Sequence, residues 1–456
     1  MKKILIIGAG KSSSYLIKYL LKKSEQENLK LIIGDISTEN SDKLINNHIN
    51  AESVVLDVFN KKQRESYIKA ADIVISMLPA RFHIEVAKDC VSYGKNMVTA
   101  SYISKEIKEL DDAVKKKGLI FMNEIGVDPG IDHMSAMQVI DRIRDNNAKI
   151  LLFESFTGGL IAPESDNNLW NYKFTWNPRN VVLAGQGGAA MFIQEGTYKY
   201  IPYHKLFRRT EFLNINGSGK FEAYANRDSL KYRNVYGLEN IPTMYRGTIR
   251  KVGFSRAWNI FVQLGMTDDS YKIENSEDMT YRDFVNLFLA YSPSDSVELK
   301  LRSYLKIDQD DVMWEKLVEL DIFSDKKKIG IKNASPAQML QKILSDSWTL
   351  KEEDKDMIVM QHLFGYEING EKRQIESSLV VIGENQTYTA MAKTVGLPVG
   401  IAALKILKGE FTTPGVQIPI SKEVYQPILK ELEEYGIKFT EKKVPFLGYN
   451  PNHITG

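Results

Sequence analysis

Ile4-Leu5-Ile6-Ile7-Gly8-Ala9-Gly10-Lys11-Ser12-Ser13 is the stretch of this 456-residue chain that decides its fold. The apolar residues at its start have the length and composition of a buried parallel strand. Apolar side chains then recur at helical spacing, at Tyr15, Leu16, Tyr19 and Leu20. A strand, a glycine-rich turn and a helix in this order form the context that a dinucleotide-binding fingerprint requires.

The glycine-rich turn matches this fingerprint in part. Gly8 permits the tight turn, and Gly10 lets the backbone approach a pyrophosphate at the helix N-terminus. Ser13 stands where the third glycine usually is, so the motif is the weaker form GxGxxS. It is not a P-loop, because Gly8 precedes Gly10 by two residues instead of five. We expect Gly8, Gly10, Lys11, Ser12 and Ser13 to contact a dinucleotide.

The second predicted strand, residues 29–34, ends at Asp35, which Ile36 follows. An acidic residue about 20 residues past the glycines accepts hydrogen bonds from the adenosine ribose hydroxyls. It would repel a 2′-phosphate, so Asp35 predicts NAD over NADP. The alternative is an Asp at a strand end that only caps the next turn.

Further strand-like runs cover residues 54–56, 73–78, 97–99 and 119–122, with helical stretches at 84–93 and 105–116. This alternation predicts a doubly wound parallel sheet, a Rossmann fold. Ligands of such sheets bind at the carboxyl ends of the strands. Further cofactor contacts are therefore expected at Ile36, Asp57, Val58, Met77, Leu78, Pro79, His83 and Ala100.

Residues 123–133, Asn-Glu-Ile-Gly-Val-Asp-Pro-Gly-Ile-Asp-His, follow the last of these strands. They put polar groups and flexible backbone at a strand's carboxyl end, where a ligand would bind. Taken alone, Asp128-Pro129-Gly130 favours a tight turn. His133 lies at a helix start, where we expect a structural role.

The later chain mixes strands, polar loops and helices. A helix capped by Thr280 is expected to bury Phe284, Leu287, Phe288 and Tyr291 in the core. A second apolar stripe consists of Met313, Leu317 and Leu320, and Ser335-Pro336 is a good start for a third helix. Near the C-terminus, a helix is expected over residues 401–407.

Composition limits the possible functions. Sixty basic and 58 acidic side chains give a net charge of +2, so we expect no attraction to nucleic acid or to anionic membranes. Cys90 is the only cysteine, which excludes internal disulfides and paired-Cys zinc sites and fits a reducing compartment. We found no histidine and carboxylate set with metal spacing, and no uninterrupted apolar run of about 18 residues. We expect a soluble cytoplasmic protein without a metal.

Several motifs in register resemble the glutamate-forming saccharopine dehydrogenases almost from end to end. They are Val98-Thr99-Ala100-Ser101-Tyr102-Ile103, residues 123–133, Gly158-Gly159 with Ala162-Pro163-Glu164, Tyr172-Lys173-Phe174-Thr175-Trp176, Asn226-Arg227-Asp228-Ser229, Arg246-Gly247-Thr248 and residues 390–398. Residues 353–360 and 421–425 look most like the lysine-degrading branch. Thr157 departs from the family, because relatives commonly have Cys there. Relatives that use NADP tend to have Arg just after the second strand.

The resemblance implies NAD-dependent oxidation of saccharopine to L-glutamate and 2-aminoadipate 6-semialdehyde in lysine degradation. It also implies a Rossmann domain (1–130 with 386–445), a central mixed α/β domain that forms a homodimer (131–265 with 346–385) and a small all-helical domain (266–345). The alternatives are an NADP-dependent saccharopine reductase in lysine biosynthesis, a carboxynorspermidine-type reductase and a non-catalytic nucleotide sensor.

The resemblance also implies a set of substrate contacts: Ser101, Tyr102, Asp128, Arg227, Thr248, Ile249 and Arg250. Asp128 and Tyr102 are the expected catalytic residues, with Asp128 beside the reacting carbon. Guanidinium groups bind carboxylates bidentately, which suits a substrate with three of them. The alternative for Arg227 and Arg250 is a surface salt bridge.

Overall fold

The computed structural model describes residues 1–215, 217–448 and 454–455. The chain divides into two units. The first consists of Met1–Lys149 and Leu379–Glu441, and the second of Ile150–Ser378 and Lys442–Gly456.

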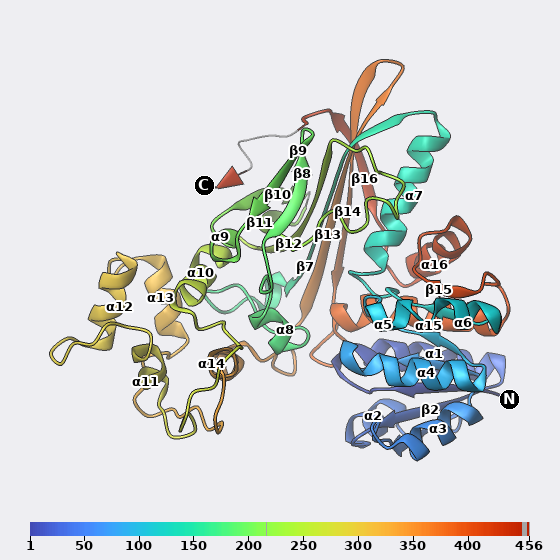
Figure 1. The fold of residues 1–456 in the computed structure, drawn as a ribbon, viewed down its shortest axis with the longest axis horizontal. Helices are drawn as coiled ribbons and strands as arrows, with labels where there is room; N and C mark the ends of the chain where they lie inside the picture. Colours follow the sequence, from blue (N-terminus) through green and yellow to red (C-terminus); the bar gives the residue numbers. More distant parts are fainter. Residues whose placement is uncertain (216, 449–453, 456) are drawn as a thin grey trace. The chain divides into compact units, whose positions relative to one another are not determined.

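A parallel sheet forms the centre of the first unit (Figure 1). Its strands are β1 (Lys2–Ile7), β2 (Leu29–Asp35), β3 (Ala51–Val55), β4 (Ile73–Ser76), β5 (Asn96–Val98), β6 (Ile120–Met122) and β15 (Gly415–Gln417). The strand order is β15-β6-β5-β4-β1-β2-β3, and all neighbouring pairs are parallel. The order reverses between β1 and β4, where doubly wound sheets bind their ligands. The predicted Rossmann sheet is confirmed.

Helices cover both faces of this sheet. They are α1 (Ser14–Glu27), α2 (Glu39–Ile45), α3 (Lys61–Ala70), α4 (His83–Tyr93), α5 (Lys105–Lys108), α6 (Asp111–Lys116) and α15 (Ala390–Leu407), while α16 (Lys422–Glu434) packs on α15 and α7 (Ile131–Asp145) packs on α16. On one face, Ile68 of α3 and Val86 of α4 pack against Leu5 and Val74. On the other face α1 and α15 lie so close that a Cβ at Gly396 would be 2.7 Å from the Leu16 nitrogen.

Helix α15 begins at Ala390, earlier than the predicted start at 401, and continues through Pro398. Proline usually breaks a helix interior. Here the small residues on α15 permit close packing on α1, and this tertiary contact keeps the helix continuous. By length and composition α15 is apolar enough to cross a membrane, but 72% of it is buried within the protein. A helix that is apolar all round and buried is expected of a core element.

Two other boundaries differ from the sequence prediction. The helical stretch 105–116 is divided into α5 and α6, and the side chain of Asp111 accepts the backbone N–H of Val416 at 2.8 Å, which ties the start of α6 to β15. Residues 131–145, which the resemblance assigns to the central domain, form α7 in the first unit. The hydroxyl of Tyr425 on α16 donates to Asp141 on α7 at 2.7 Å. The three-domain division itself stays a prediction.

The second unit is built on a mixed sheet. Its strands are β7 (Lys149–Ile161), β8 (Ala190–Gln194), β9 (Thr197–Ile201), β10 (Thr210–Ile215), β11 (Gly219–Ala225), β12 (Thr243–Lys251), β13 (Asp356–Ile368), β14 (Glu371–Ile382), β16 (Thr440–Pro445) and β17 (Ile454–Thr455). The order is β16-β14-β13-β7-β12-β11-β10-β17, with β8 and β9 attached to β12. Strands β7 and β12 pair in parallel, whereas β12, β11 and β10 are antiparallel. The predicted mixed α/β architecture is confirmed.

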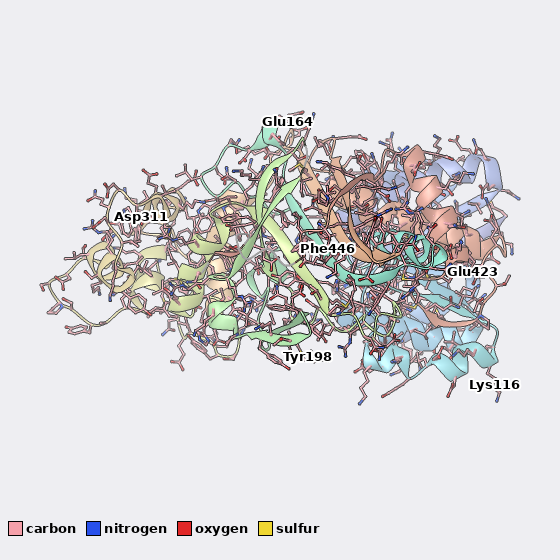
Figure 2. All side chains as sticks on the ribbon, turned by 90° about the horizontal axis from the view of Figure 1, so that it is seen from above. Lys116, Glu164, Tyr198, Asp311, Glu423 and Phe446 are labelled. Carbon is pink, nitrogen blue, oxygen red and sulfur yellow. The ribbon has the colours of Figure 1, made fainter. Side chains whose placement is uncertain are left out.

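Helices of the second unit are α8 (Pro178–Val182), α9 (Tyr203–Leu206), α10 (Phe254–Leu264), α11 (Tyr281–Asn286), α12 (Val297–Leu305), α13 (Val312–Glu319) and α14 (Pro336–Trp348). Figure 1 shows α11 to α14 grouped together. Ser335 begins α14 with a capping box, as the sequence predicted. Asp311, labelled in Figure 2, caps α13 by accepting the Met313 N–H at 2.8 Å.

The stripe predicted after Thr280 is only partly buried. Thr280 caps α11 with a capping box, and Phe284 is buried. The helix ends at Asn286, so Leu287 and Tyr291 do not continue its inner face, and Tyr291 is 91% exposed. The prediction of core packing for these two residues is wrong, because apolar spacing does not show where a helix stops.

Candidate functional site

The glycine-rich turn joins β1 to α1 and lies against the end of β4. Gly8 has φ 104°, and a Cβ there would lie 2.9 Å from the Met77 carbonyl oxygen. Gly10 has no heavy atom within 4 Å of its ideal Cβ position, so the space beside it is open. Ser13 donates a hydrogen bond to the Gly10 carbonyl at 2.6 Å, which accounts for a serine at the third position. This geometry fits a pyrophosphate at the start of the helix.

Asp35, at the end of β2, points at this turn. Its Oδ2 accepts the Ala9 N–H at 2.6 Å, and its Oδ1 accepts the Ile36 N–H at 2.6 Å. The two roles considered for Asp35 are therefore compatible. Its carboxylate caps the turn that follows β2, and it also lies beside the glycine-rich turn. Asn40 also holds Ala9, by donating to its carbonyl oxygen. Sequence reasoning missed Asn40, because no motif marks it.

The other predicted cofactor residues follow β3 and β4. Asp57 is exposed, and its Oδ1 accepts the Phe59 N–H at 2.9 Å. Val58 packs in the core of the unit. Met77 and Leu78 are half-buried, with their backbone next to Gly8, and Pro79 and Lys11 are exposed. Of this set, the Met77-Leu78 backbone lies nearest the glycine-rich turn.

The two predicted catalytic residues meet at the carboxyl ends of β5 and β6. The Tyr102 hydroxyl donates to Asp128 Oδ1 at 3.3 Å. Tyr102 is 45% exposed and Asp128 is half-buried, so both face open space. Ala100 touches the same loop, since a Cβ at Gly126 would lie 3.0 Å from Ala100 Cβ. The arrangement can present a carboxylate and a phenol to a ligand at the sheet edge.

His83 lies behind Ser101 and is only 1% exposed. Its Nδ1 is 2.7 Å from the Ser76 hydroxyl, and its Nε2 is 2.7 Å from the Ser101 hydroxyl. Burial lowers the pKa of His83 to about 4. The sequence predicts that His83 touches the nucleotide, whereas the structure places its ring in the interior, between two serines.

Glu124 connects the two catalytic segments, and sequence reasoning missed it. Its N–H donates to the Ser101 carbonyl at 3.0 Å, and its Oε1 accepts the Ile103 N–H at 3.0 Å. Its Oε2 lies 3.0 Å from His133 Nε2, at the start of α7. No signal in the sequence marks this role, because Glu124 lies in a loop with other polar residues, Asn123 and Asp128. The structural role expected for His133 is consistent with this contact.

Of the remaining predicted substrate residues, Arg227 follows β11, and Thr248, Ile249 and Arg250 lie on β12 of the second unit. Arg227 is exposed, and its guanidinium donates to the Gln186 carbonyl at 2.6 Å. Thr248 donates to Asn226 Oδ1 at 2.7 Å, and Ile249 is buried. Gly158 on β7 lies close to Ile249, whose carbonyl oxygen would be 2.5 Å from a Cβ there. These contacts hold the Asn226-Arg227 segment beside β12.

Arg250 is 4% exposed and surrounded by aromatic rings. Its guanidinium carbon lies 5.0 Å from the Tyr172 ring centroid, 5.3 Å from that of Phe254 and 5.6 Å from that of Tyr224. Within the described part of the chain, no carboxylate lies within 4.0 Å of Arg227 or Arg250, which argues against the salt-bridge alternative for both. A buried guanidinium without an anion is costly.

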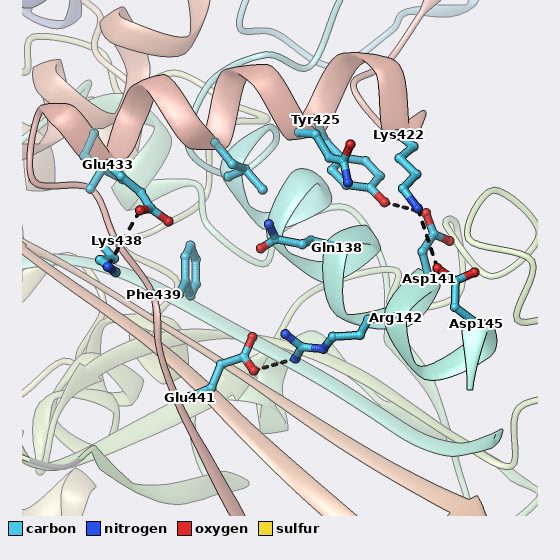
Figure 3. A pocket seen from close by; sticks show the side chains of 13 residues that line it. Gln138, Asp141, Arg142, Asp145, Lys422, Tyr425, Glu433, Lys438, Phe439 and Glu441 are labelled. Atoms are coloured by element: carbon cyan, nitrogen blue, oxygen red, sulfur yellow. Dashed lines mark hydrogen bonds and ion pairs between the residues drawn. The ribbon is translucent and has the colours of Figure 1, made fainter. Parts of the chain in front are cut away.

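A groove with a volume of about 550 Å³ lies between α7 and α16 in the first unit (Figure 3). Its charged side chains pair with one another: Arg142 with Glu441 at 2.5 Å, Lys422 with Asp145 at 3.6 Å and Lys438 with Glu433 at 3.7 Å. None of the predicted site residues lines it. Across the described residues, no group of three or more His, Cys, Asp or Glu side chains is placed to hold a metal ion.

Comparisons with known proteins cover almost all of this chain. Residues 4–122 match the family model "Saccharopine dehydrogenase NADP binding domain", and residues 126–437 match "Saccharopine dehydrogenase C-terminal domain". The solved structure of apo saccharopine dehydrogenase (L-Glu forming) from Saccharomyces cerevisiae has a TM-score of 0.87 at 31% identity, covering 97% of this chain and 100% of that chain.

Two groups of relatives are similar at this level. The Schizosaccharomyces pombe protein named saccharopine dehydrogenase [NADP(+), L-glutamate-forming] is 32% identical over 97% of this chain and 99% of its own length. The rat mitochondrial alpha-aminoadipic semialdehyde synthase is 34% identical over 96% of this chain. The chain spans about half the length of the rat protein, 47%.

Proposed function

The chain belongs to the saccharopine dehydrogenase family, and from this premise we propose that it oxidises saccharopine to L-glutamate and 2-aminoadipate 6-semialdehyde with NAD. The observation that carries the proposal is the contact between Tyr102 and Asp128, 3.3 Å apart, at the carboxyl edge of a sheet that also presents the glycine-rich turn.

The structure of saccharopine determines which chemical steps Tyr102 and Asp128 must support. The C–H beside the secondary amine of saccharopine loses a hydride, which the nicotinamide accepts when it is bound, and water then hydrolyses the imine. Asp128 is proposed to stabilise the positive charge of the imine and to exchange protons with the amine or the water. The Tyr102 hydroxyl fixes the direction of the Asp128 carboxylate. The substrate's own amine also offers a proton-transfer route.

Substrate carboxylates need donors. Ser101 offers a hydroxyl in the first unit. In the second unit, Thr248, the backbone at Ile249 and the guanidinium groups of Arg227 and Arg250 stay our predicted contacts. Arg227 supports this, because it is exposed and has no carboxylate partner within the described residues, and a guanidinium at a carboxylate site must be available to its ligand.

NAD is proposed as the cofactor because of Asp35. Its carboxylate is 2.6 Å from the Ala9 nitrogen, where an adenosine 2′-phosphate would meet a negative charge. The fungal relatives carry NADP(+) in their names, so the NADP-dependent reductase is the second candidate. The homodimer, the cytoplasmic location and the role in lysine degradation remain proposals.

The test is reduction of NAD and of NADP by the purified protein with saccharopine, alongside Asp128→Ala, Tyr102→Phe and the exposed control Asp112→Ala. Asp128→Ala should lower kcat at least about 100-fold, the usual size of an acid–base contribution. Asp112→Ala should match the wild type.

Other results would redirect the proposal. Wild-type turnover in Asp128→Ala would show that Asp128 is not a catalytic residue. Faster turnover with NADP than with NAD would show that Asp35 does not select NAD. Turnover of aspartate semialdehyde with diaminopropane, but none of saccharopine, would indicate the carboxynorspermidine-type reductase. Tight NAD binding without any turnover would indicate a nucleotide sensor.

A further inference from the structure

A chain of hydrogen bonds runs from Ser76 at the end of β4, through the His83 ring, to Ser101 beyond β5. Both ring nitrogens lie 2.7 Å from a serine oxygen. The ring is 1% exposed and has no carboxylate within hydrogen-bond distance in the described residues, so nothing there favours the charged form. His83 is therefore a neutral imidazole, with one nitrogen as donor and the other as acceptor.

We propose that His83 is a positioning residue that makes the Ser101 hydroxyl a donor toward a substrate carboxylate; this inference rests on the proposed function. A carboxylate only accepts hydrogen bonds, so Ser101 must direct its hydrogen toward the substrate. The oxygen of Ser101 is then free to accept from His83 Nε2–H. The Nδ1 atom of His83, left without a hydrogen, accepts from the Ser76 hydroxyl.

Independent contacts hold the backbone of Ser101. Its carbonyl accepts the Glu124 N–H at 3.0 Å, and its N–H donates to Thr99 Oγ1 at 3.3 Å. Loss of the imidazole therefore leaves residue 101 in place and frees only the direction of its hydroxyl. A structural role for His83 predicts a general loss of folding or cofactor binding, whereas the positioning role predicts weaker substrate binding alone.

The experiment compares His83→Leu with His83→Gln in the whole 456-residue chain. Glutamine places an amide N–H near the position of Nε2, whereas leucine removes the donor. His48→Leu is the matched control, because His48 pairs with Glu25 at 3.2 Å, away from the site. His83→Leu should raise the KM for saccharopine about 10-fold, as expected for a lost hydrogen bond to a charged group, with kcat and NADH affinity near wild type. His83→Gln should restore most of the loss.

A second measurement does not depend on turnover. The ¹⁵N resonances of His83 in the wild-type protein should show the proton on Nε2, and Ser76→Ala should change the Nδ1 resonance. A proton on Nδ1, or equal KM values for the leucine and glutamine variants, would overturn the inference. Loss of NADH affinity in both variants would also overturn it. If the wild type does not oxidise saccharopine, the proposed function fails, and the ¹⁵N result still decides the hydrogen-bond direction.

Discussion

Glu124 Oε2 lies 3.0 Å from His133 Nε2, and both side chains are almost completely buried, at 2% and 0% exposure. The contact ties the loop before Asp128 to the first turn of α7. Through its other oxygen, Glu124 holds the segment that carries Tyr102. One buried side chain thus fixes the separation of the two proposed catalytic residues.

Replacing Glu124 should destabilise the first unit. Glu124→Gln keeps an acceptor for the Ile103 N–H but replaces the carboxylate oxygen that faces His133 with an amide. Leaving a buried hydrogen-bonding group without its partner typically costs about 1–3 kcal/mol, so the free energy of unfolding should fall by that order. Denaturant titration measures it. The exposed control Glu109→Gln should stay within about 0.5 kcal/mol of wild type. Equal stability of the two variants would show that the pair is not a stabilising contact.

The two glycines of the turn should respond differently to alanine. Gly8→Ala forces a side chain into φ 104° and against the Met77 carbonyl, so stability and cofactor binding should both fall. The Cβ that Gly10→Ala adds has no heavy atom within 4 Å, so this variant should fold normally. Its methyl group would occupy the space that a pyrophosphate needs, so NADH affinity should fall by about 10-fold or more. Thermal melting and NADH fluorescence titration separate the effects. Unchanged NADH affinity in Gly10→Ala would show that the cofactor does not bind at this turn.

Asp35 and Asp72 provide a matched pair for testing cofactor choice. Both carboxylates accept a backbone N–H at or next to β1. Asp35 accepts from Ala9 at 2.6 Å, just after the end of the strand, and Asp72 accepts from Lys3 at 2.7 Å, at its start. Asp35→Ser should raise kcat/KM with NADP and lower it with NAD, shifting the ratio at least about 10-fold, because a repulsive charge is removed. Asp72→Ser should leave the ratio unchanged. If Asp35→Ser leaves the ratio of the kcat/KM values for NADP and NAD unchanged, this carboxylate does not determine the choice of cofactor.

Local rules explain what could be predicted from the sequence. The turn at Gly8 and Gly10 depends on strand, turn and helix signals within a few residues, and the structure has the same geometry. Motif resemblance assigned Tyr102 and Asp128 to one site, and they can meet because strands β5 and β6 are neighbours in a parallel sheet. Parallel order places the ends of consecutive strands together.

Long-range contacts account for the misses. The continuity of α15 through Pro398 depends on its packing against α1, which local proline rules cannot include. Asn40 and Glu124 act on residues about 20 to 30 positions away, and no periodicity marks them. Asp111 ties the start of α6 to Val416, some 300 residues further along. Each of these features requires the tertiary structure.

The second unit should lose stability as the pH rises through neutrality, because of Glu154 and Glu211. Burial raises the pKa of Glu211 to about 7, an effect that Arg209 reduces, and burial together with the Glu211 charge raises the pKa of Glu154 well above its ordinary value of 4.5. Between about pH 4.5 and 7 the folded state therefore binds more protons than the unfolded state. The free energy of unfolding falls with rising pH wherever this holds. The stability that these two protonated carboxyl groups contribute is fully present below about pH 4.5 and is lost as the pH rises through their pKa values in the folded state.

Glu211→Gln should remove much of this dependence, because the amide stays neutral. The variant should show a flatter stability curve from pH 5 to 8 in denaturant titrations, and it should exceed wild-type stability at pH 8, where the wild type must bury a charged carboxylate. Glu239→Gln, which replaces an exposed carboxylate of the same unit, controls for net charge and should follow the wild-type curve. A wild-type slope in Glu211→Gln would show that other groups titrate over this range.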